Sequence, residues 1–154
     1  MTTLAYRAGV MASDSRAYAG NSLSIGNKPK IHRLKDGSIF AVSSRVPGID
    51  SVLREWVERG AVLALAPRVD TRTFTLLLVK PTGAVFYAEN EFTLSGPLQG
   101  EFFAIGSGDN IALGAMAMGA DAVRAVAIAC ELDVWTKGPI MTMKLKELER
   151  VADR

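Results

Sequence analysis

The order of strand-like and helix-like segments restricts the fold of this chain more than any other feature of its sequence. Short apolar runs bounded by Gly, Pro, Asp and Ser recur along the chain, and helical periodicity interrupts them twice. We expect strands over 2–7, 10–14, 30–34, 38–44, 73–79, 84–88, 102–106 and 134–145, with a polar connection over 15–28. Strands, a helix, strands, two helices and a strand predict an α+β fold, for which two facing sheets with helices outside are one layered solution.

Glycine-containing turns and apolar stripes locate the elements more closely. Three hairpins would turn at Ala8-Gly9, Lys35-Asp36-Gly37 and Pro81-Thr82-Gly83, because Asp and Gly adopt turn conformations at little cost. A first helix would follow Pro47-Gly48 and end at Gly60, with an apolar face of Ile49, Val52, Leu53, Trp56 and Val57. Two later helices, separated by Gly119, would carry the stripes Ile111, Gly114, Ala115 and Met118, and Val123, Val126, Ala127 and Cys130.

Composition predicts a single domain over 1–154 that ends in a charged tail over 145–154. Of the 154 residues, 49% are hydrophobic and 22% are charged, which is enough to bury about two thirds of the unfolded surface. The net charge of +2, without a long basic run, gives no nucleic-acid footprint and no anchor for acidic lipids. With neither a secretory signal pattern nor an apolar span of ~18 residues, we expect a cytoplasmic location.

The sequence indicates neither a metal nor another cofactor. No cluster of His, Cys, Asp or Glu has the spacing of metal ligands. The single cysteine, Cys130, permits no internal disulfide, and its place on a helical stripe favours a core position over a reactive thiol. The single histidine, His32, excludes Ser-His and Cys-His triads unless it acts alone.

Two threonines, Thr2 and Thr3, stand directly behind Met1 and open an apolar run. A threonine hydroxyl is a poor nucleophile and needs a nearby base. Removal of Met1 would give Thr2 a free α-amine, whose ordinary pKa of about 7.7 to 8.0 suits proton transfer. Thr2 would then be nucleophile and base in one residue. The alternative is that Thr2 only begins a strand.

Further motifs follow Thr2 and Thr3 in a recognisable order. Asp14 lies within 10–15, Lys30 within 27–34, Ser107 within 103–108, and Asp133 and Thr136 within 132–136. This order resembles the proteasome β-subunit family, most closely its bacterial HslV peptidase branch, from Thr2 to about Pro139. The pairs Gly20-Asn21 and Gly26-Asn27 and the run Ala104-Ile105-Gly106-Ser107-Gly108 are also similar to HslV, whereas Ala12-Ser13-Asp14-Ser15-Arg16 is similar to the Anbu branch.

The resemblance implies the four-layer αββα sandwich of N-terminal nucleophile hydrolases. Between Gly60 and Thr73 the chain is too short for the long helix of most relatives, so we expect a trimmed subunit with a loop or one helical turn there. The implied activity is that of a threonine-type endopeptidase acting on unfolded polypeptides. Relatives enclose such sites in stacked hexameric or heptameric rings of identical subunits and work with an ATP-dependent unfoldase, so both partners are expected here.

The resemblance also assigns roles to single residues. Thr2 Oγ1 would attack the peptide carbonyl, while Lys30 would favour the neutral form of the Thr2 amine and Asp14 would hold Lys30. Ser107 would hydrogen-bond near that amine. Asp133 and Thr136 would orient Ser107 and the amine. Replacement of Lys30 by Met would then abolish activity with little loss of stability.

Ser107 has other interpretations from its sequence context alone. It would suit a helix N-cap. The nucleophile elbow of α/β hydrolases is excluded, because Ile105 and Asp109 occupy the positions that require glycine.

The chain departs from the family where the oxyanion hole is expected. Relatives place glycines after the second hairpin, but this chain has Val42-Ser43-Ser44-Arg45. A backbone N–H survives such a change, so the hole is expected around Ser44 and Arg45. Close approach of substrate is then less favourable, because a Cβ takes the room. Tyr18, His32 and Val42 are expected to contact the substrate.

Two rival functions belong to other classes. One is a proteasome-fold ring that serves as a scaffold with weak or no catalysis, which Arg45 favours. The other is a small-amide hydrolase of the wider N-terminal nucleophile group, which needs no enclosing chamber. Assembly is also expected from the apolar surface around Trp56, Met116 and Met118, since exposed apolar patches tend to be interfaces.

Overall fold

The computed structural model describes residues 2–19, 23–68 and 73–146. Met1, the Gly20-Asn21 pair and most of the predicted charged tail lie outside the described residues. The strands are β1 (Thr3–Arg7), β2 (Val10–Ser13), β3 (Arg16–Ala19), β4 (Leu23–Asn27), β5 (Ile31–Arg33), β6 (Ile39–Ser44), β7 (Phe74–Val79), β8 (Val85–Glu89), β9 (Phe102–Gly106) and β10 (Met141–Lys144). The helices are α1 (Ile49–Glu58), α2 (Asp109–Ala117) and α3 (Ala122–Leu132), with a 3-10 turn over Leu63–Leu65.

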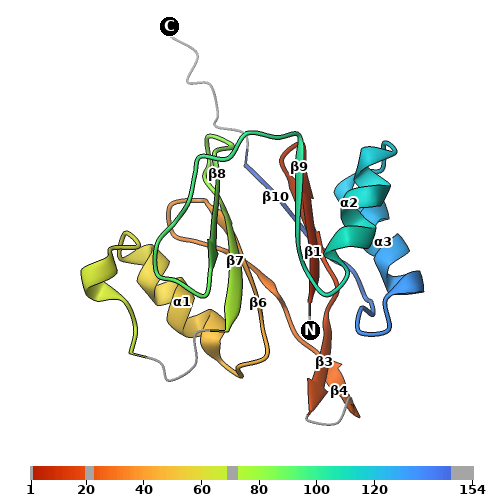
Figure 1. Cartoon of the computed structure of the whole chain (residues 1–154), viewed down its shortest axis with the longest axis horizontal. Coiled ribbons are helices and arrows are strands. Elements are labelled where there is room, and N and C mark those ends of the chain that lie inside the picture. Colours follow the sequence, from red (N-terminus) through yellow and green to blue (C-terminus); the bar gives the residue numbers. More distant parts are fainter. Residues whose placement is uncertain (1, 20–22, 69–72, 147–154) are drawn as a thin grey trace, which may run out of the picture.

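The described strands form two four-stranded sheets and a separate hairpin. One sheet has the order β10-β2-β1-β9, the other has the order β5-β6-β7-β8, and β3 pairs with β4 alone. The paired strands are antiparallel. Figure 1 shows the two larger sheets with one face of each turned toward the other, and the β3-β4 hairpin extends beyond them. Side chains from both sheets, among them Leu4, Met11, Ile39, Leu77 and Ile105, form one core cluster.

Helices cover the outer faces of the two sheets. On one side, α1 packs Leu53 and Trp56 against Phe40 and Leu76 of β6 and β7. On the other side, α2 and α3 pack small residues such as Ala112 and Ala125 against the alanines of β1 and β2. The expected class of a mixed fold with sheets and helices is confirmed, and the short 3-10 turn agrees with the trimming expected after Gly60 (Figure 1). None of the described helices is long and apolar enough to cross a membrane.

Two strand predictions were wrong. The segment 15–28 is no simple connection, because β3 and β4 form a hairpin there whose second strand is exposed at every residue. Such a strand has no alternation of buried and exposed residues to reveal it. The last strand does not span 134–145 but covers only Met141–Lys144, and the residues before it build a loop beside the start of β1.

The buried faces of the helices also differ from the predicted stripes. In α1, Val52 is exposed, while Ile49, Leu53, Trp56 and Val57 are buried as expected. In α2 and α3 the buried residues are Ala112, Met116, Ala122, Ala125, Val126 and Ala129, largely one position away from the predicted stripes. Alanine allows a helix to approach a sheet closely, so small residues take the inner face and larger ones remain outside.

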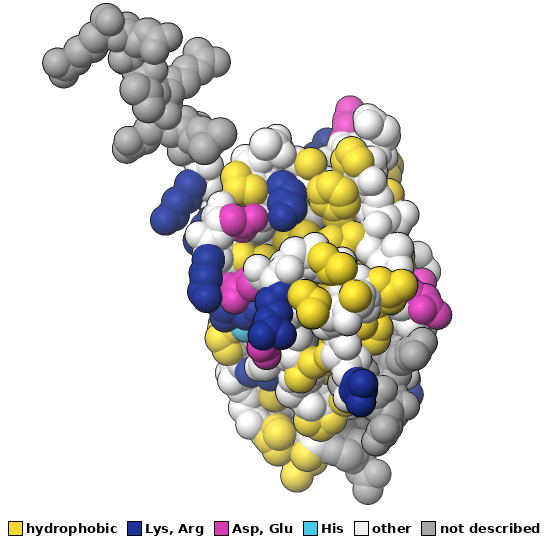
Figure 2. All heavy atoms as spheres, turned by 90° about the vertical axis from the view of Figure 1, so that its left-hand side faces the viewer, with side chains coloured by type: hydrophobic (Ala, Val, Ile, Leu, Met, Phe, Trp, Pro, Cys, Tyr) yellow, Lys and Arg dark blue, Asp and Glu magenta, His cyan; other side chains and the backbone are white. Residues whose placement is uncertain are grey.

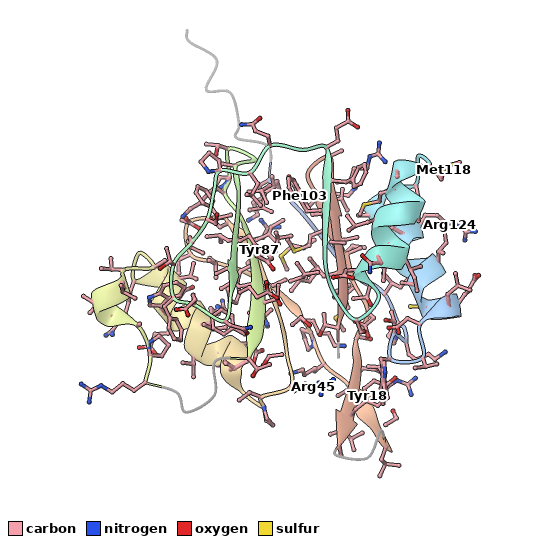
Figure 3. The ribbon with its side chains drawn as sticks, in the orientation of Figure 1. Tyr18, Arg45, Tyr87, Phe103, Met118 and Arg124 are labelled. Atoms are coloured by element: carbon pink, nitrogen blue, oxygen red, sulfur yellow. The ribbon has the colours of Figure 1, made fainter. Side chains whose placement is uncertain are left out.

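Arg7 fixes the end of α2 in this orientation. Its Nη1 donates hydrogen bonds to the carbonyl oxygens of Met116, at 2.7 Å, and Ala120, at 2.9 Å. Met116 is therefore held against the sheet, whereas Met118 is 89% exposed at the far end of α2 (Figure 3).

The apolar surface available for assembly is only partly the predicted one, because Met118 is exposed whereas Trp56 and Met116 are buried. Trp56 is only 2% exposed and packs edge-on against Phe92, with ring centroids 5.4 Å apart. Further exposed apolar side chains lie on α1 and around the 3-10 turn, namely Val52, Val62, Leu63 and Leu65, and others lie on β4 and at the end of α3. Figure 2 shows hydrophobic side chains distributed over this face of the molecule.

Candidate active site

The peptide group between Thr2 and Thr3 is held by hydrogen bonds from the segments next to β1. The Thr2 carbonyl oxygen accepts a hydrogen bond from the Ser107 N–H at 2.7 Å, and the Thr3 N–H donates to Asp14 Oδ1 at 2.9 Å. The turn after β9 approaches so closely that a Cβ at Gly106 would lie 1.7 Å from the Thr2 oxygen, and Gly106 also has a φ of 104°. Only glycine suits this position. The peptide that joins Thr2 to Thr3 is therefore held at both of its polar groups.

The two threonines differ in what their side chains do. Thr3 is fully buried, and its Oγ1 lies 2.6 Å from Thr136 Oγ1 and accepts from the Gly108 N–H at 2.9 Å. Its hydroxyl is thus part of the structural network. The Thr2 side chain instead lines a cavity of about 700 Å³. Of the two threonines, Thr2 is the one that lines the cavity, although the residue is only 4% exposed.

Asp14 and Lys30 form a buried ion pair next to this threonine pair. Lys30 Nζ lies 2.9 Å from Asp14 Oδ2, and the two side chains are 3% and 0% exposed. Burial lowers the pKa of Lys30, an effect that the Asp14 charge and hydrogen bond partly oppose. Asp14 also accepts the Thr3 N–H and, at 3.4 Å, the Lys137 N–H. The same carboxylate therefore positions both Lys30 and the start of β1.

Ser107, Asp133 and Thr136 form a second hydrogen-bonded group. Ser107 Oγ donates to Asp133 Oδ2 at 2.8 Å, and Thr136 Oγ1 donates to the same carboxylate oxygen. Ser107 Oγ lies 3.5 Å from the Thr2 carbonyl oxygen. The N-cap interpretation of Ser107 was wrong, because Gly108 caps α2 without a side-chain hydrogen bond. Through Thr136 this group reaches the Thr3 hydroxyl.

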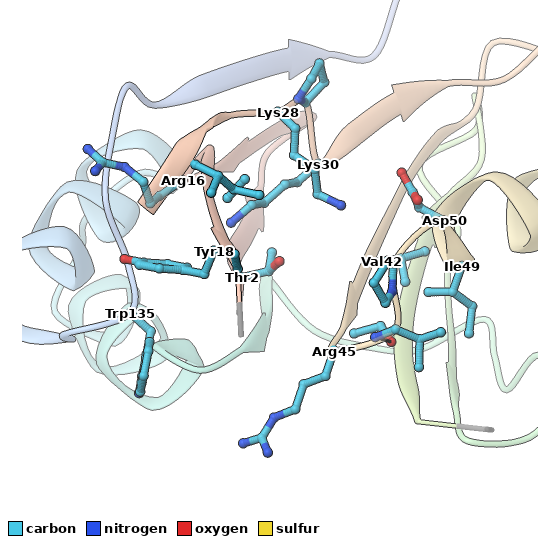
Figure 4. A pocket seen from close by; sticks show the side chains of 18 residues that line it. Thr2, Arg16, Tyr18, Lys28, Lys30, Val42, Arg45, Ile49, Asp50 and Trp135 are labelled. Carbon is cyan, nitrogen blue, oxygen red and sulfur yellow. Dashed lines mark hydrogen bonds between the residues drawn. The ribbon is translucent and has the colours of Figure 1, made fainter. Parts of the chain in front are cut away.

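The cavity has two facing walls (Figure 4). One wall carries Tyr18 of β3 and Trp135, whose rings meet edge to face with centroids 5.7 Å apart. The other wall carries Val42 and the segment from Ser44 to Asp50, at the end of β6 and the start of α1. Thr2 and Lys30 line the cavity between them. Its volume of about 700 Å³ is within the usual range of ligand-binding sites.

The predicted substrate contacts are partly found in this cavity. Tyr18, Val42, Ser44 and Arg45 line it. The Ser44 hydroxyl is turned to its own loop, where it donates to the Thr73 carbonyl and accepts from the Val46 N–H.

His32 is not among the lining residues, which corrects its predicted contact with substrate. It lies behind Asp50, with 3.4 Å between Nε2 and Asp50 Oδ2. Burial lowers the pKa of His32, although the Asp50 charge opposes this, so the imidazole is neutral at pH 7.

The sequence alone did not single out Trp135, Arg16 or Lys28 as parts of this cavity. Trp135 stands inside the motif that contains Asp133 and Thr136, and a large aromatic side chain in a polar loop was the available signal. Arg16 and Lys28 flank the hairpin that the sequence did not predict.

Comparison with known proteins agrees with the fold. No family model and no curated protein matches the chain. Among solved structures, BPH of Thiobacillus denitrificans, a proteasome-like β-subunit, shares 21% identity at a TM-score of 0.61 over 94% of this chain and 98% of its own. BPH in complex with epoxomicin shares 22% identity at a TM-score of 0.62 with the same coverage. HslV of Trypanosoma brucei shares 19% identity at a TM-score of 0.68 over 93% of this chain and 98% of its own. The expected fold of proteasome-like β-subunits and HslV is therefore confirmed.

Proposed function

We propose that this chain is an HslV-like threonine endopeptidase that cleaves unfolded polypeptides with Thr2 as its nucleophile. The observation that carries the proposal is the contrast between the two threonines. Thr3 is fully buried and hydrogen-bonded to Thr136 and Gly108, while the Thr2 side chain lines the cavity together with Lys30. Removal of Met1 would add a free amine to Thr2, next to this cavity.

The proposed reaction uses the two polar groups of mature Thr2. Its amine takes the proton from Oγ1 as Oγ1 attacks the carbonyl carbon of the scissile peptide bond. The amine then returns this proton to the departing peptide nitrogen, which leaves an ester between Thr2 and the acyl part of the substrate. Water hydrolyses this ester and regenerates Thr2. The positive charge of Lys30 favours the neutral, basic form of the amine and lowers the pKa of the hydroxyl.

The transition state needs a donor for its oxyanion. Backbone N–H groups of Ser44 or Arg45 are the proposed donors, since both residues line the cavity opposite Thr2. The Cβ atoms at these positions narrow the approach of a substrate relative to glycine. We therefore expect a narrower range of substrates than in relatives with glycine there.

The fold and its neighbours support the wider expectations for the family. Two facing sheets between α1 and the α2-α3 pair support a four-layer αββα sandwich. Similarity to HslV and to BPH supports a homo-oligomeric ring, hexameric or heptameric, that encloses the sites. An ATP-dependent unfoldase would supply unfolded polypeptide to such a chamber.

Epoxomicin provides a direct test, because the similar BPH binds it. Intact-mass measurement should first find the subunit without Met1. After incubation with epoxomicin, the mass of the wild-type subunit should rise by one epoxomicin molecule, and fluorogenic peptide hydrolysis should stop. The Thr2→Ala variant is the control and should gain no mass. A subunit that keeps Met1 and hydrolyses no peptide would contradict the proposal and favour the scaffold.

Assembly is the second expected property of this function. The subunit exposes large apolar side chains at Leu63, Leu65, Leu132 and Val134, each at least 50% accessible, and closed symmetry is the usual way in which identical subunits cover such residues. Light scattering coupled to size exclusion should give a mass many times the 16.5 kDa of one subunit. A clean monomer with amidase activity would point to the small-amide hydrolase instead.

A further inference from the structure

The cavity beside Thr2 has an unusual balance of charge. Four basic side chains line it, those of Arg16, Lys28, Lys30 and Arg45, against the single carboxylate of Asp50. The charge of Lys30 is balanced by Asp14 at 2.9 Å. Three cations therefore remain to act on whatever enters the cavity.

These three cations have no carboxylate partner within the described ranges. Arg16 Nη1 donates to Ser24 Oγ at 2.8 Å, but its Nε is buried and has no hydrogen-bond partner among the described residues. Lys28 and Arg45 are exposed. A buried N–H without an acceptor is costly, so an acceptor supplied by a ligand would stabilise this wall.

Asp50 does not cancel the basic character of the cavity. It lies on the wall opposite Arg16, while Lys28 lies beside Lys30 between the two walls (Figure 4). Its neighbour His32 is 3.4 Å away and half-buried. The carboxylate thus offsets at most one of the three cations, and the cavity stays positive.

We propose that the cavity selects polypeptide segments with acidic side chains close to the cleaved bond. This inference rests on the proposed peptidase function and specifies its substrates. Lys28 beside Lys30 and Arg45 on the opposite wall can each receive a carboxylate from an extended chain that passes Thr2 (Figure 4). The Arg16 guanidinium turns toward Ser24 of β4 and adds positive charge to the rim of the cavity. Tyr18, Trp135 and Val42 provide apolar contacts for the methylene groups of such side chains. A lysine or arginine of the substrate would instead meet like charge, which disfavours its binding.

Three fluorogenic peptides of equal length provide the test, with glutamate, leucine or lysine next to the coumarin leaving group. We expect kcat/KM for the glutamate peptide to exceed that for the leucine peptide by about tenfold, with the lysine peptide slowest. The preference should shrink as the salt concentration rises from about 0.01 M to about 1 M, because salt screens charges near the surface. Equal rates for the three peptides, or a preference that salt does not change, would overturn the inference.

Single-charge variants connect the preference to the cavity. Arg45→Ala and Lys28→Ala should each lower the glutamate-to-leucine ratio about threefold. Arg124→Ala is the matched control, since it removes the same charge from an exposed position on α3, away from the cavity (Figure 3). The control should leave the ratio unchanged. A loss of the preference in the Arg124 variant as large as in the Arg45 variant would mean that net charge acts without the cavity.

Binding to the Thr2→Ala protein separates failure of this inference from failure of the proposed function. Fluorescence anisotropy with labelled glutamate-rich and lysine-rich peptides requires no cleavage. If the wild type cleaves nothing but Thr2→Ala binds the glutamate-rich peptide more tightly, the peptidase proposal fails and the charge selection stands. If the wild type cleaves all peptides equally and neither peptide is bound in preference, the charge selection fails and the peptidase proposal stands.

Discussion

Replacement of Thr2 by Ala should lower kcat/KM for fluorogenic peptides by at least about a thousandfold. The variant keeps the free amine, the Thr2 carbonyl bond to Ser107 and the Thr3 N–H bond to Asp14, but it lacks the attacking oxygen. Folding and assembly should therefore remain those of the wild type. Hydrolysis assays, thermal unfolding and light scattering on the same preparation check this prediction. Residual activity above about one thousandth of wild type would indicate Ser107 or a contaminant as the source.

Two neighbouring variants sharpen this prediction. Thr2→Ser keeps both the hydroxyl and the amine, so it should retain activity within about tenfold of wild type. Thr3→Val removes the hydroxyl that accepts from the Gly108 N–H and contacts Thr136. Because it leaves buried partners unsatisfied, Thr3→Val should lower the free energy of unfolding by roughly 1–3 kcal/mol. A Thr3→Val protein that is stable but inactive would indicate that the catalytic hydroxyl belongs to Thr3 and not to Thr2.

The sheets were predictable because their strands alternate or run apolar between turn residues. The turns at Ala8-Gly9, Lys35-Asp36-Gly37 and Pro81-Thr82-Gly83 do join the expected strand pairs. The β3-β4 hairpin was not predictable from periodicity, since β4 is exposed throughout and buries no face. The faces of α2 and α3 were misplaced for a different reason. Hydrophobic size marks residues such as Val123, but close packing on the sheet selects alanines.

The site was predictable to the extent that each motif supplies one group to it. Asp14, Lys30, Ser107, Asp133 and Thr136 come from distant parts of the chain, and the structure brings them to the first two threonines. Their catalytic roles stay predictions. The part of the cavity formed by the β3-β4 hairpin and the loop before β10 was less predictable, because it depends on how these two segments fold back toward β1. For this reason Arg16, Lys28 and Trp135 became visible only with the structure.

Replacement of Lys30 by Met should abolish peptide hydrolysis, because no positive charge would then favour the neutral amine of Thr2. In the wild type, activity should depend on the Lys30 charge in the same way, through the pKa of Lys30. Burial lowers this pKa below its ordinary value of 10.5, so Lys30 loses its charge at a lower pH in the folded protein than in the unfolded chain. The rate should fall as pH rises through the lowered pKa.

For this group alone, the free energy of unfolding should rise with pH between the lowered pKa and 10.5, since the unfolded chain holds the proton more tightly there.

Burial of the pair also changes the expected effect of Lys30→Met on stability. The sequence alone suggested little loss, but the Asp14 and Lys30 side chains are 0% and 3% exposed. Among the described residues, Lys30→Met would leave the buried carboxylate with the N–H groups of Thr3 and Lys137 as its donors. The expected cost is about 3–5 kcal/mol, as is usual when one partner of a buried pair is removed. Denaturant unfolding measures this cost.

The double variant Asp14→Asn with Lys30→Met separates the two roles of the lysine. Without the carboxylate there is no buried charge left unpaired, so much of the lost stability should return. Activity should not return, because the charge next to the Thr2 amine is still missing. A double variant that is both stable and active would mean that Lys30 serves only to neutralise Asp14. The charge needed by Thr2 would then come from another cation of the cavity, with Lys28 as the nearest substitute in the sequence.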